Sequence, residues 1–315
     1  MDFLYPKRLH LELTSRCNYK CIICNHGYKE FRNDISNRLK DIIIYELIPK
    51  ANFLELQGTG ESLLSEDLED ILSAARKYRC NTTLITNASL LSKESFLLLI
   101  KSNCQLVISL DSIIDETYRT IRGNGSLSRV KDNLSYWKFI KNNLPIGCNS
   151  SLSINMVLCS LNYNELIPMI DYAVDTGASY LFVSEIRNCI PCQEIWEKLT
   201  LENIKLSKEF RKIVDAATDY AHSKKLPISF NFRKTISDCH TKNICISPWE
   251  HVFIDSDGNL SVCCALTDTF GNLNNQNFIS IWNGEKINKF RSDMALGLYH
   301  NACKTCCLSW GITNR

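Results

Sequence analysis

The sequence lacks several features that would assign it to a membrane, to secretion or to a nucleic acid. No apolar run approaches the roughly 20 residues that span a bilayer, and residues 1–8 lack the apolar core of a signal peptide. A net charge of +2 leaves no basic excess for nucleic acid or an anionic membrane. No internal repeat or low-complexity segment is present. We therefore expect a cytoplasmic protein with neither a nucleic-acid nor a membrane partner.

Cysteine, by contrast, is abundant, with 16 among 315 residues. Disulfide frameworks belong to oxidising compartments, and no secretion signal points to one here. The cysteine content therefore favours metal chemistry in a reducing compartment. The chain is long enough to bury one sizeable core and to add a small second domain.

Short strand-like runs alternate with amphipathic stretches from Leu9 to about Ser184. Repeated β–α units of this kind predict a parallel sheet with helices packed outside it. Six units are too few for a complete eight-stranded barrel. Strands are expected at 9–13, 53–56, 82–85, 106–109, 152–157 and 180–183, and helices near 38–49, 66–78, 91–101, 127–141 and 163–175.

The pattern changes after a polar helix expected at about 202–224. Residues 226–232 read as a strand, and beyond them cysteines and turn residues multiply. We place a boundary within 225–238. The expected domains are 1–224 and 225–315.

Three cysteines, Cys17, Cys21 and Cys24, follow the first expected strand with C-x3-C-x2-C spacing. In β/α barrels the chemistry lies at the carboxyl ends of the strands, which is where this loop falls. A closed structural zinc site needs four protein ligands. An iron–sulfur cluster with one iron open to a small molecule accounts better for three. A zinc site or buried thiols stay as alternatives.

A second group of cysteines lies near the C-terminal end. Cys245 and Cys263 flank an expected hairpin whose turn is Asp255-Ser256-Asp257-Gly258. Cys303 and Cys306 add a C-x2-C pair. Four thiolates can close a [4Fe–4S] cluster or hold zinc. Cys239 is an alternative fourth ligand.

The first cysteine loop resembles the cluster loop of the radical S-adenosylmethionine (SAM) enzymes. That resemblance implies a partial (β/α)6 barrel of the TIM type, a [4Fe–4S] cluster on Cys17, Cys21 and Cys24, and SAM bound at the fourth iron. The second group resembles the auxiliary-cluster region of the SPASM/Twitch branch. It implies one auxiliary [4Fe–4S] cluster in a small, cysteine-rich domain of β-hairpin and helices. The chemistry also implies an electron donor such as flavodoxin or ferredoxin.

The same resemblance identifies residues that are expected to bind SAM. Gly58-Thr59-Gly60-Glu61 matches the family's Gly-Gly-Glu motif, whose backbone contacts the SAM amino group, although Thr59 departs from it. Ser109 would touch the ribose or the carboxylate, and Arg122 would pair with the carboxylate. The alternative for Arg122 is a solvated charge at a helix end. The expected cofactor-binding residues are His26, Gly58, Gly60, Glu61, Asn87, Ser109, Arg122 and Asn155.

Three of these assignments are weaker matches to the family. His26 occupies the place of an aromatic residue that contacts adenine in relatives, but Ile23 departs from the aromatic residue usual before the third cysteine. Asn87 and Asn155 lie after the third expected strand and on the fifth. Either could instead be a hydrogen-bonded turn or strand amide.

The family's reaction begins with SAM cleavage to a 5′-deoxyadenosyl radical, which removes a hydrogen atom from a substrate C–H bond. Cys264, just after Cys263, is the candidate catalytic residue. Sulfatase-maturing relatives have an aspartate base there, and a peptide epimerase branch has a hydrogen-donating cysteine. Strand alternation would turn Cys264 away from the cluster. We expect epimerisation, with dehydrogenation as the other outcome.

We expect no peptide-recognition domain before the barrel. This favours a small polar substrate, such as a sugar or an aminocyclitol. Modification of a ribosomal peptide by an epimerase or maturase is the first alternative, and a non-catalytic zinc protein is the second.

Overall fold

The computed structural model describes residues 4–27, 33–141, 143–144, 148–187, 192–205, 207–232, 245–304 and 306. The chain divides into two compact units. One comprises Met1–Arg16, Arg32–Thr83 and Phe232–Arg315, and the other comprises Cys17–Phe31 and Leu84–Asn231. The division of the chain into domains 1–224 and 225–315 stays a prediction.

The first unit contains strands from both ends of the chain, in the order β10-β9-β8-β1-β2. β1 pairs in parallel with β2 on one side and with β8 on the other, so that Leu9 lies opposite both Leu54 and Val252. These three side chains are buried. β8 and β9 form the expected antiparallel hairpin. The strands are β1 (Arg8–Leu11), β2 (Phe53–Leu56), β8 (His251–Ile254), β9 (Asn259–Ser261) and β10 (Gly271–Asn272).

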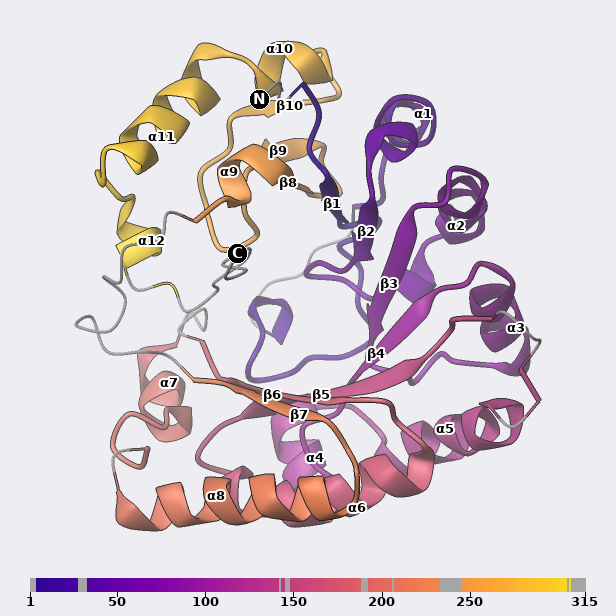
Figure 1. Cartoon of the computed structure of the whole chain (residues 1–315), viewed down its shortest axis with the longest axis vertical. Helices are drawn as coiled ribbons and strands as arrows, with labels where there is room; N and C mark the ends of the chain where they lie inside the picture. Colours follow the sequence, from indigo (N-terminus) through magenta and orange to yellow (C-terminus); the bar gives the residue numbers. More distant parts are fainter. Residues whose placement is uncertain are drawn as a thin grey trace. The chain divides into compact units, whose positions relative to one another are not determined.

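Helices surround these strands, and Figure 1 shows α1 and α2 on the outer side of β1 and β2. The helix expected at 38–49 is divided into three pieces, the last of which contains Pro49, a residue without a backbone N–H to donate. The helical segments are α1 (Asn37–Ile42), η2 (Ile43–Leu47), η3 (Ile48–Lys50), η4 (Ser62–Leu64), α2 (Leu68–Lys77), α9 (Ser247–Glu250), α10 (Phe278–Trp282), α11 (Glu285–Ala295) and α12 (Asn301–Lys304).

The second unit contains four parallel strands in the order β4-β5-β6-β7. They are β4 (Gln105–Ser109), β5 (Leu152–Leu158), β6 (Leu181–Glu185) and β7 (Ile228–Asn231), and β3 (Asn81–Thr86) leads into this unit from the first. Alternate residues such as Ile108, Ile154 and Val183 are buried, as the two-residue period of a strand requires.

Helices connect these parallel strands, and Figure 1 shows α6 and α8 on one side of β5, β6 and β7. Ser207 caps α8, because its side chain accepts a hydrogen bond from the N–H of Phe210. The helical segments are η1 (Asn25–Gly27), α3 (Lys93–Lys101), α4 (Asp115–Arg122), α5 (Leu127–Lys141), η5 (Tyr163–Glu165), α6 (Leu166–Thr176), α7 (Gln193–Leu199) and α8 (Lys208–Ser223).

The expected fold class is confirmed: a parallel α/β core is followed by a β-hairpin and helices. Each of the strands expected between Leu9 and Ser184 is present. The strand expected at 226–232 is β7, which pairs in parallel with β6. The polar helix expected at 202–224 begins later, at Lys208. Helix α4 was not predicted.

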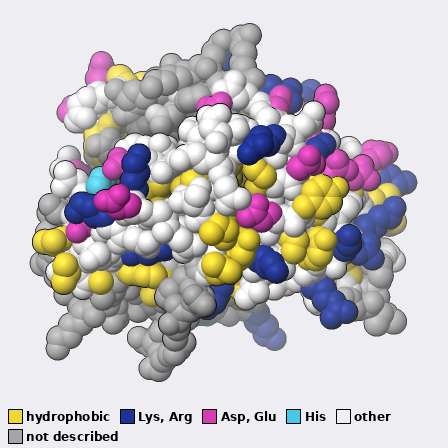
Figure 2. All heavy atoms as spheres, turned by 90° about the horizontal axis from the view of Figure 1, so that it is seen from above, with side chains coloured by type: hydrophobic (Ala, Val, Ile, Leu, Met, Phe, Trp, Pro, Cys, Tyr) yellow, Lys and Arg dark blue, Asp and Glu magenta, His cyan; other side chains and the backbone are white. Residues whose placement is uncertain are grey.

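The described surface carries charges of both signs. On the described part of the face in Figure 2, lysine and arginine side chains are interspersed with aspartate and glutamate. Among the helices that the structure describes, none has both the length and the apolar character needed to cross a bilayer.

Candidate functional site

The three cysteines of the first loop each have a positively polarised group beside the sulfur. The N–H of Tyr19 lies 3.5 Å from Cys17 Sγ, and the N–H of His26 lies 3.4 Å from Cys24 Sγ. Arg122 Nη1 lies 4.0 Å from Cys21 Sγ. Such groups stabilise the thiolate, which is the form of cysteine that binds metal. This donor set fits an iron–sulfur cluster.

The end of helix α4 holds this loop in place. The N–H of Ile22 donates to the carbonyl of Ile121 at 2.9 Å, and the N–H of Lys20 donates to Asn124 Oδ1 at 2.8 Å. Gly123, with φ of +62°, ends the helix, and a Cβ there would lie 2.3 Å from the carbonyl oxygen of Lys20. Only glycine allows this approach.

A second set of contacts joins the loop to the segment after β3. Asn87 Nδ2 donates to Asn18 Oδ1 at 3.0 Å, and Asn18 Nδ2 donates to Ser89 Oγ at 2.8 Å. Ser89 Oγ donates in turn to Asn87 Oδ1 at 2.6 Å. Asn87 therefore orients the residue that follows Cys17. Its contact with SAM stays a prediction.

Arg122 is buried rather than solvated, which excludes an exposed charge at a helix end. Its Nε lies 2.6 Å from Asp111 Oδ2, and the Asp111 side chain is 0% exposed. Asp111 Oδ1 accepts a hydrogen bond from the N–H of Val157 at 2.9 Å. Burial alone would lower the pKa of Arg122, but Asp111, Cys21 and Tyr118 together hold that pKa above its ordinary value. The Arg122 contact with the SAM carboxylate stays a prediction.

The charge of Arg122 also acts on Cys21. Burial raises the pKa of the Cys21 thiol above its ordinary value, and Arg122 acts in the opposite direction. The buried cation therefore favours the thiolate at the most deeply buried cysteine of the loop.

Ser109 and Asn155 are brought together, although they are 46 positions apart in the chain. They are opposite each other in the register of β4 and β5, and both are partly exposed. The neighbouring Ile108 and Ile154 are buried, so the two polar side chains share the other face. His26, in η1, is 9% exposed. The predicted roles of these three residues with SAM are not tested by this arrangement.

The Gly58–Glu61 loop packs against the backbone that leads into the first cysteine. A Cβ at Gly60 would lie 2.1 Å from the Thr14 carbonyl oxygen. The N–H of Glu61 donates to the carbonyl of Arg16 at 2.8 Å. The Glu61 carboxylate accepts from the N–H of Leu63 at 3.3 Å and so caps η4.

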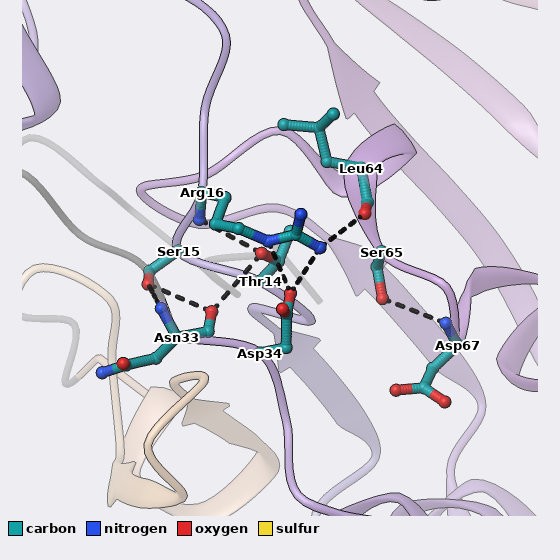
Figure 3. A network of polar contacts seen from close by, with 8 residues as sticks. All are labelled: Thr14, Ser15, Arg16, Asn33, Asp34, Leu64, Ser65 and Asp67. Atoms are coloured by element: carbon teal, nitrogen blue, oxygen red, sulfur yellow. Dashed lines mark hydrogen bonds and ion pairs between the residues drawn. The ribbon is translucent and has the colours of Figure 1, made fainter.

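A polar network fixes the same segment from its other side (Figure 3). Arg16 Nη2 lies 3.0 Å from Asp34 Oδ1 and donates to the Leu64 carbonyl at 2.9 Å. Ser15 and Asn33 exchange hydrogen bonds between side chain and backbone. The residues just before Cys17 are therefore held rigidly by contacts that the cysteine pattern does not reveal.

The second group of cysteines also converges. Burial, together with the charges of Cys306, Cys263 and Cys245, raises the pKa of Cys303 to about 12. The four thiols are thus close enough to interact. Cys263 Sγ accepts from the N–H of Ala265 at 3.4 Å. Four thiols that repel one another as anions fit a multivalent cationic group. Cys239 lies outside the described residues.

Among the residues that the structure describes, no group of three or more His, Cys, Asp or Glu side chains is arranged to hold one metal ion. A single zinc ion requires that tight arrangement. A four-iron cluster instead binds its thiolates at separate iron atoms.

Cys264 does not lie in a strand. β9 ends at Ser261, and Cys264 is a partly exposed residue in the turn that follows. The strand alternation from which we expected its direction therefore does not apply. Its catalytic role stays a prediction.

Most of the other described cysteines are structural. Burial raises the pKa of Cys80, Cys104 and Cys159 to about 12, which keeps these thiols protonated. Cys148 and Cys192 are partly exposed, and Cys189 and Cys307 lie outside the described residues.

Comparisons with known proteins agree with this arrangement. A family model described as the radical SAM superfamily matches residues 11–173, and SPASM, described as an iron–sulfur cluster-binding domain, matches residues 245–307. A probable GTP 3′,8-cyclase of Methanococcus maripaludis is 26% identical over 216 residues, which are 66% of this chain and 67% of that protein.

Solved structures of Streptococcus suis SuiB have a similar fold. The structure bound to S-adenosylmethionine has a TM-score of 0.70, with 19% identity over 96% of this chain and 72% of SuiB. The structure bound to the precursor peptide SuiA has a TM-score of 0.71, with 19% identity over 96% of this chain and 71% of SuiB.

These matches identify the groups that the chain binds. The two domains imply a [4Fe–4S] cluster that binds SAM, SAM itself and an auxiliary iron–sulfur cluster. The radical SAM match covers more than half of the chain. The chain therefore belongs to the radical SAM superfamily and carries a C-terminal SPASM domain.

Proposed function

We propose that this chain inverts a carbon centre of its substrate, with Cys264 as the donor of the returning hydrogen atom. The observation that carries the proposal is the thiol of Cys264 directly after Cys263, which belongs to the converging auxiliary cysteines. A thiol at this position favours donation of a hydrogen atom over removal of a proton. Dehydrogenation is the alternative outcome.

The bound cofactors supply a 5′-deoxyadenosyl radical, which takes a hydrogen atom from a substrate C–H bond. Cys264 then transfers the hydrogen atom of its S–H bond to the carbon radical, and a new C–H bond forms on the opposite face. The resulting sulfur radical regains its S–H bond with one electron from a donor such as flavodoxin or ferredoxin and one proton from solvent. Arg122 and Asn18 hold the loop that binds the cluster.

The proposed substrate is a small polar molecule that resembles a sugar or an aminocyclitol. A peptide is the second candidate, because SuiB has a similar fold over 96% of this chain and was solved with a precursor peptide. Incubation of the purified enzyme with SAM, a reductant and each substrate class distinguishes the two, since only a true substrate increases the yield of 5′-deoxyadenosine.

The Cys264 proposal predicts incorporation of solvent hydrogen. A thiol exchanges its proton with solvent, so a reaction in deuterium oxide should place one deuterium at the inverted carbon. Cys264→Ala should still cleave SAM but form no epimer. Mass spectrometry of the product measures both results.

Cys148→Ala is the matched control, because Cys148 is also a partly exposed cysteine and lies outside the auxiliary group. It should leave both the product and its deuterium content unchanged. A product oxidised by two electrons, without solvent deuterium, would contradict the proposal and favour dehydrogenation.

The auxiliary cysteines should hold a cluster that both transfers electrons and stabilises its domain. Single alanine substitutions of Cys245, Cys263, Cys303 and Cys306 should reduce iron from about eight to about four atoms per chain. They should also lower solubility, because a closed thiolate site contributes folding energy. Iron analysis after anaerobic purification measures the loss. If all four variants keep full iron and stability, the ligand set is wrong, and Cys239 is the next residue to substitute.

A further inference from the structure

Glu12 is a buried carboxylate that contacts two separate loops. It follows the last residue of β1 and is 5% exposed. Its Oε2 accepts a hydrogen bond from the N–H of Thr59. Its Oε1 accepts from Ser256 Oγ at 2.9 Å and from the Ser256 N–H at 3.4 Å. The two oxygens of this one carboxylate thus accept hydrogen bonds from two different segments of the chain.

One of those segments belongs to the expected SAM-binding loop, and the other belongs to the hairpin of the auxiliary-cluster domain. Thr59 lies within the Gly58–Glu61 loop that is expected to contact SAM. Ser256 lies at the tip of the β8–β9 hairpin, between the auxiliary cysteines Cys245 and Cys263. Strand pairing places both loops beside Glu12: its N–H donates to the Ile254 carbonyl at 2.9 Å, and the Gln57 N–H donates to the Leu11 carbonyl at 3.1 Å.

The glycine before Thr59 is explained by the same carboxylate. A Cβ at Gly58 would lie 2.3 Å from Glu12 Oε2 and 2.4 Å from its Cγ. Any other residue at position 58 would therefore push the loop away from Glu12. The first glycine of the motif allows Thr59 to reach the carboxylate, whatever the loop then binds.

One carboxylate makes both sets of contacts, so a change in one set is expected to affect the other. An ionised carboxylate is costly to bury unless hydrogen bonds replace its hydration, and within the described residues its contacts are N–H and O–H donors rather than an ion pair. Bonds to a charged acceptor are stronger than neutral ones. If the hairpin moves away, the Glu12 carboxylate loses the two hydrogen-bond donors of Ser256. The strength of its remaining hydrogen bond from the Thr59 N–H then changes.

We infer that Glu12 is a positioning residue that sets the geometry of the Gly58–Glu61 loop and makes SAM affinity depend on the auxiliary hairpin. This inference rests on the proposed SAM chemistry in one respect, namely that the loop contacts SAM. Ser256 is its distant partner, 244 positions away in the sequence.

The test compares Glu12→Gln and Ser256→Ala in the fully loaded enzyme. A glutamine amide has one acceptor oxygen where the carboxylate has two, so the Kd for SAM should rise about tenfold, the loss of one charged hydrogen bond. Ser256→Ala should raise the Kd in the same direction, and the double variant should bind SAM no more weakly than Glu12→Gln alone. Equilibrium dialysis measures the Kd, and iron content should be unchanged.

Hydrogen exchange supplies a readout without SAM. The amide of Thr59 should exchange faster in both variants. Glu12→Gln weakens the acceptor of this amide, and Ser256→Ala removes the hydroxyl that restrains that acceptor. Ser261→Ala is the matched control: Ser261 is also a buried serine of this hairpin, and its substitution should change neither measurement.

The outcomes separate this inference from the proposed function. Additive effects of the two substitutions, or an unchanged Kd in Ser256→Ala, would overturn the coupling. Ser256→Ala removes only a hydroxyl, so the test remains decisive even if Glu12→Gln does not fold. A wild-type enzyme that binds no SAM would instead overturn the assignment of the loop.

Discussion

Replacement of Cys17, Cys21 and Cys24 together by alanine is expected to abolish the reductive cleavage of SAM. The three thiols are the proposed protein ligands of the SAM-binding cluster, and no partial site would remain without them. The auxiliary cysteines, in the other group, should still hold about four iron atoms per chain. Chromatography of 5′-deoxyadenosine and iron analysis measure the two effects in one preparation.

A single substitution of an auxiliary cysteine should remove the other cluster and leave the first one in place. Cys303→Ala should lose auxiliary iron but keep the iron of the first loop. Formation of 5′-deoxyadenosine by the triple variant at the wild-type rate would remove the central assignment. Loss of all iron from the triple variant would indicate that the two sites do not assemble independently.

Arg122→Ala should destabilise the protein by about 3–5 kcal/mol, because it leaves the buried carboxylate of Asp111 without its counter-charge. The Asp111 side chain is 0% exposed, and its second oxygen is already used by the N–H of Val157. The carboxylate therefore cannot turn to solvent. Urea denaturation measures the change in the free energy of unfolding.

Arg119 offers a control on the same helix. It pairs with Asp115 at 2.6 Å, but the two side chains are 68% and 55% exposed, so Arg119→Ala should cost less than about 1 kcal/mol. Asp111→Asn should restore part of the stability lost in Arg122→Ala, because it removes the uncompensated charge. If Arg122→Ala is as mild as Arg119→Ala, the buried pair is not the stabilising contact.

The strands could be predicted because each carries a local pattern. Strand-like runs such as Leu106–Ser109 are short and lie between amphipathic stretches, so their positions follow from periodicity. The adjacency of Ser109 and Asn155, by contrast, follows from the parallel pairing of β4 with β5 in the structure. The cysteine spacings are also local, and for this reason both predicted metal centres follow from the sequence.

The remaining features depend on contacts between segments that are distant in the sequence. No local pattern relates Arg122 to Asp111, because their meeting depends on how α4 returns to the end of β4. The same is true of Asn18 with Asn87, and of Glu12 with Ser256. Helix α4 was missed because it is short: its eight residues contain two apolar positions, Tyr118 and Ile121, which are too few to establish a period from the sequence. Cys264 was assigned to a strand that ends earlier because turn residues and strand residues overlap in composition.

The parallel pairing of β1 with β8 has a consequence for how the protein is made. Lys7 and Glu250, which form an ion pair beside these strands, are 243 positions apart. During synthesis the amino-terminal strand emerges long before its partner, and closing so long a loop is slow. That edge of β1 therefore has exposed N–H and C=O groups until the hairpin emerges from the ribosome, which is the condition under which strands aggregate. Premature termination between β7 and β8 should yield an insoluble product, and chaperones that cover strand edges should improve the yield of the full chain.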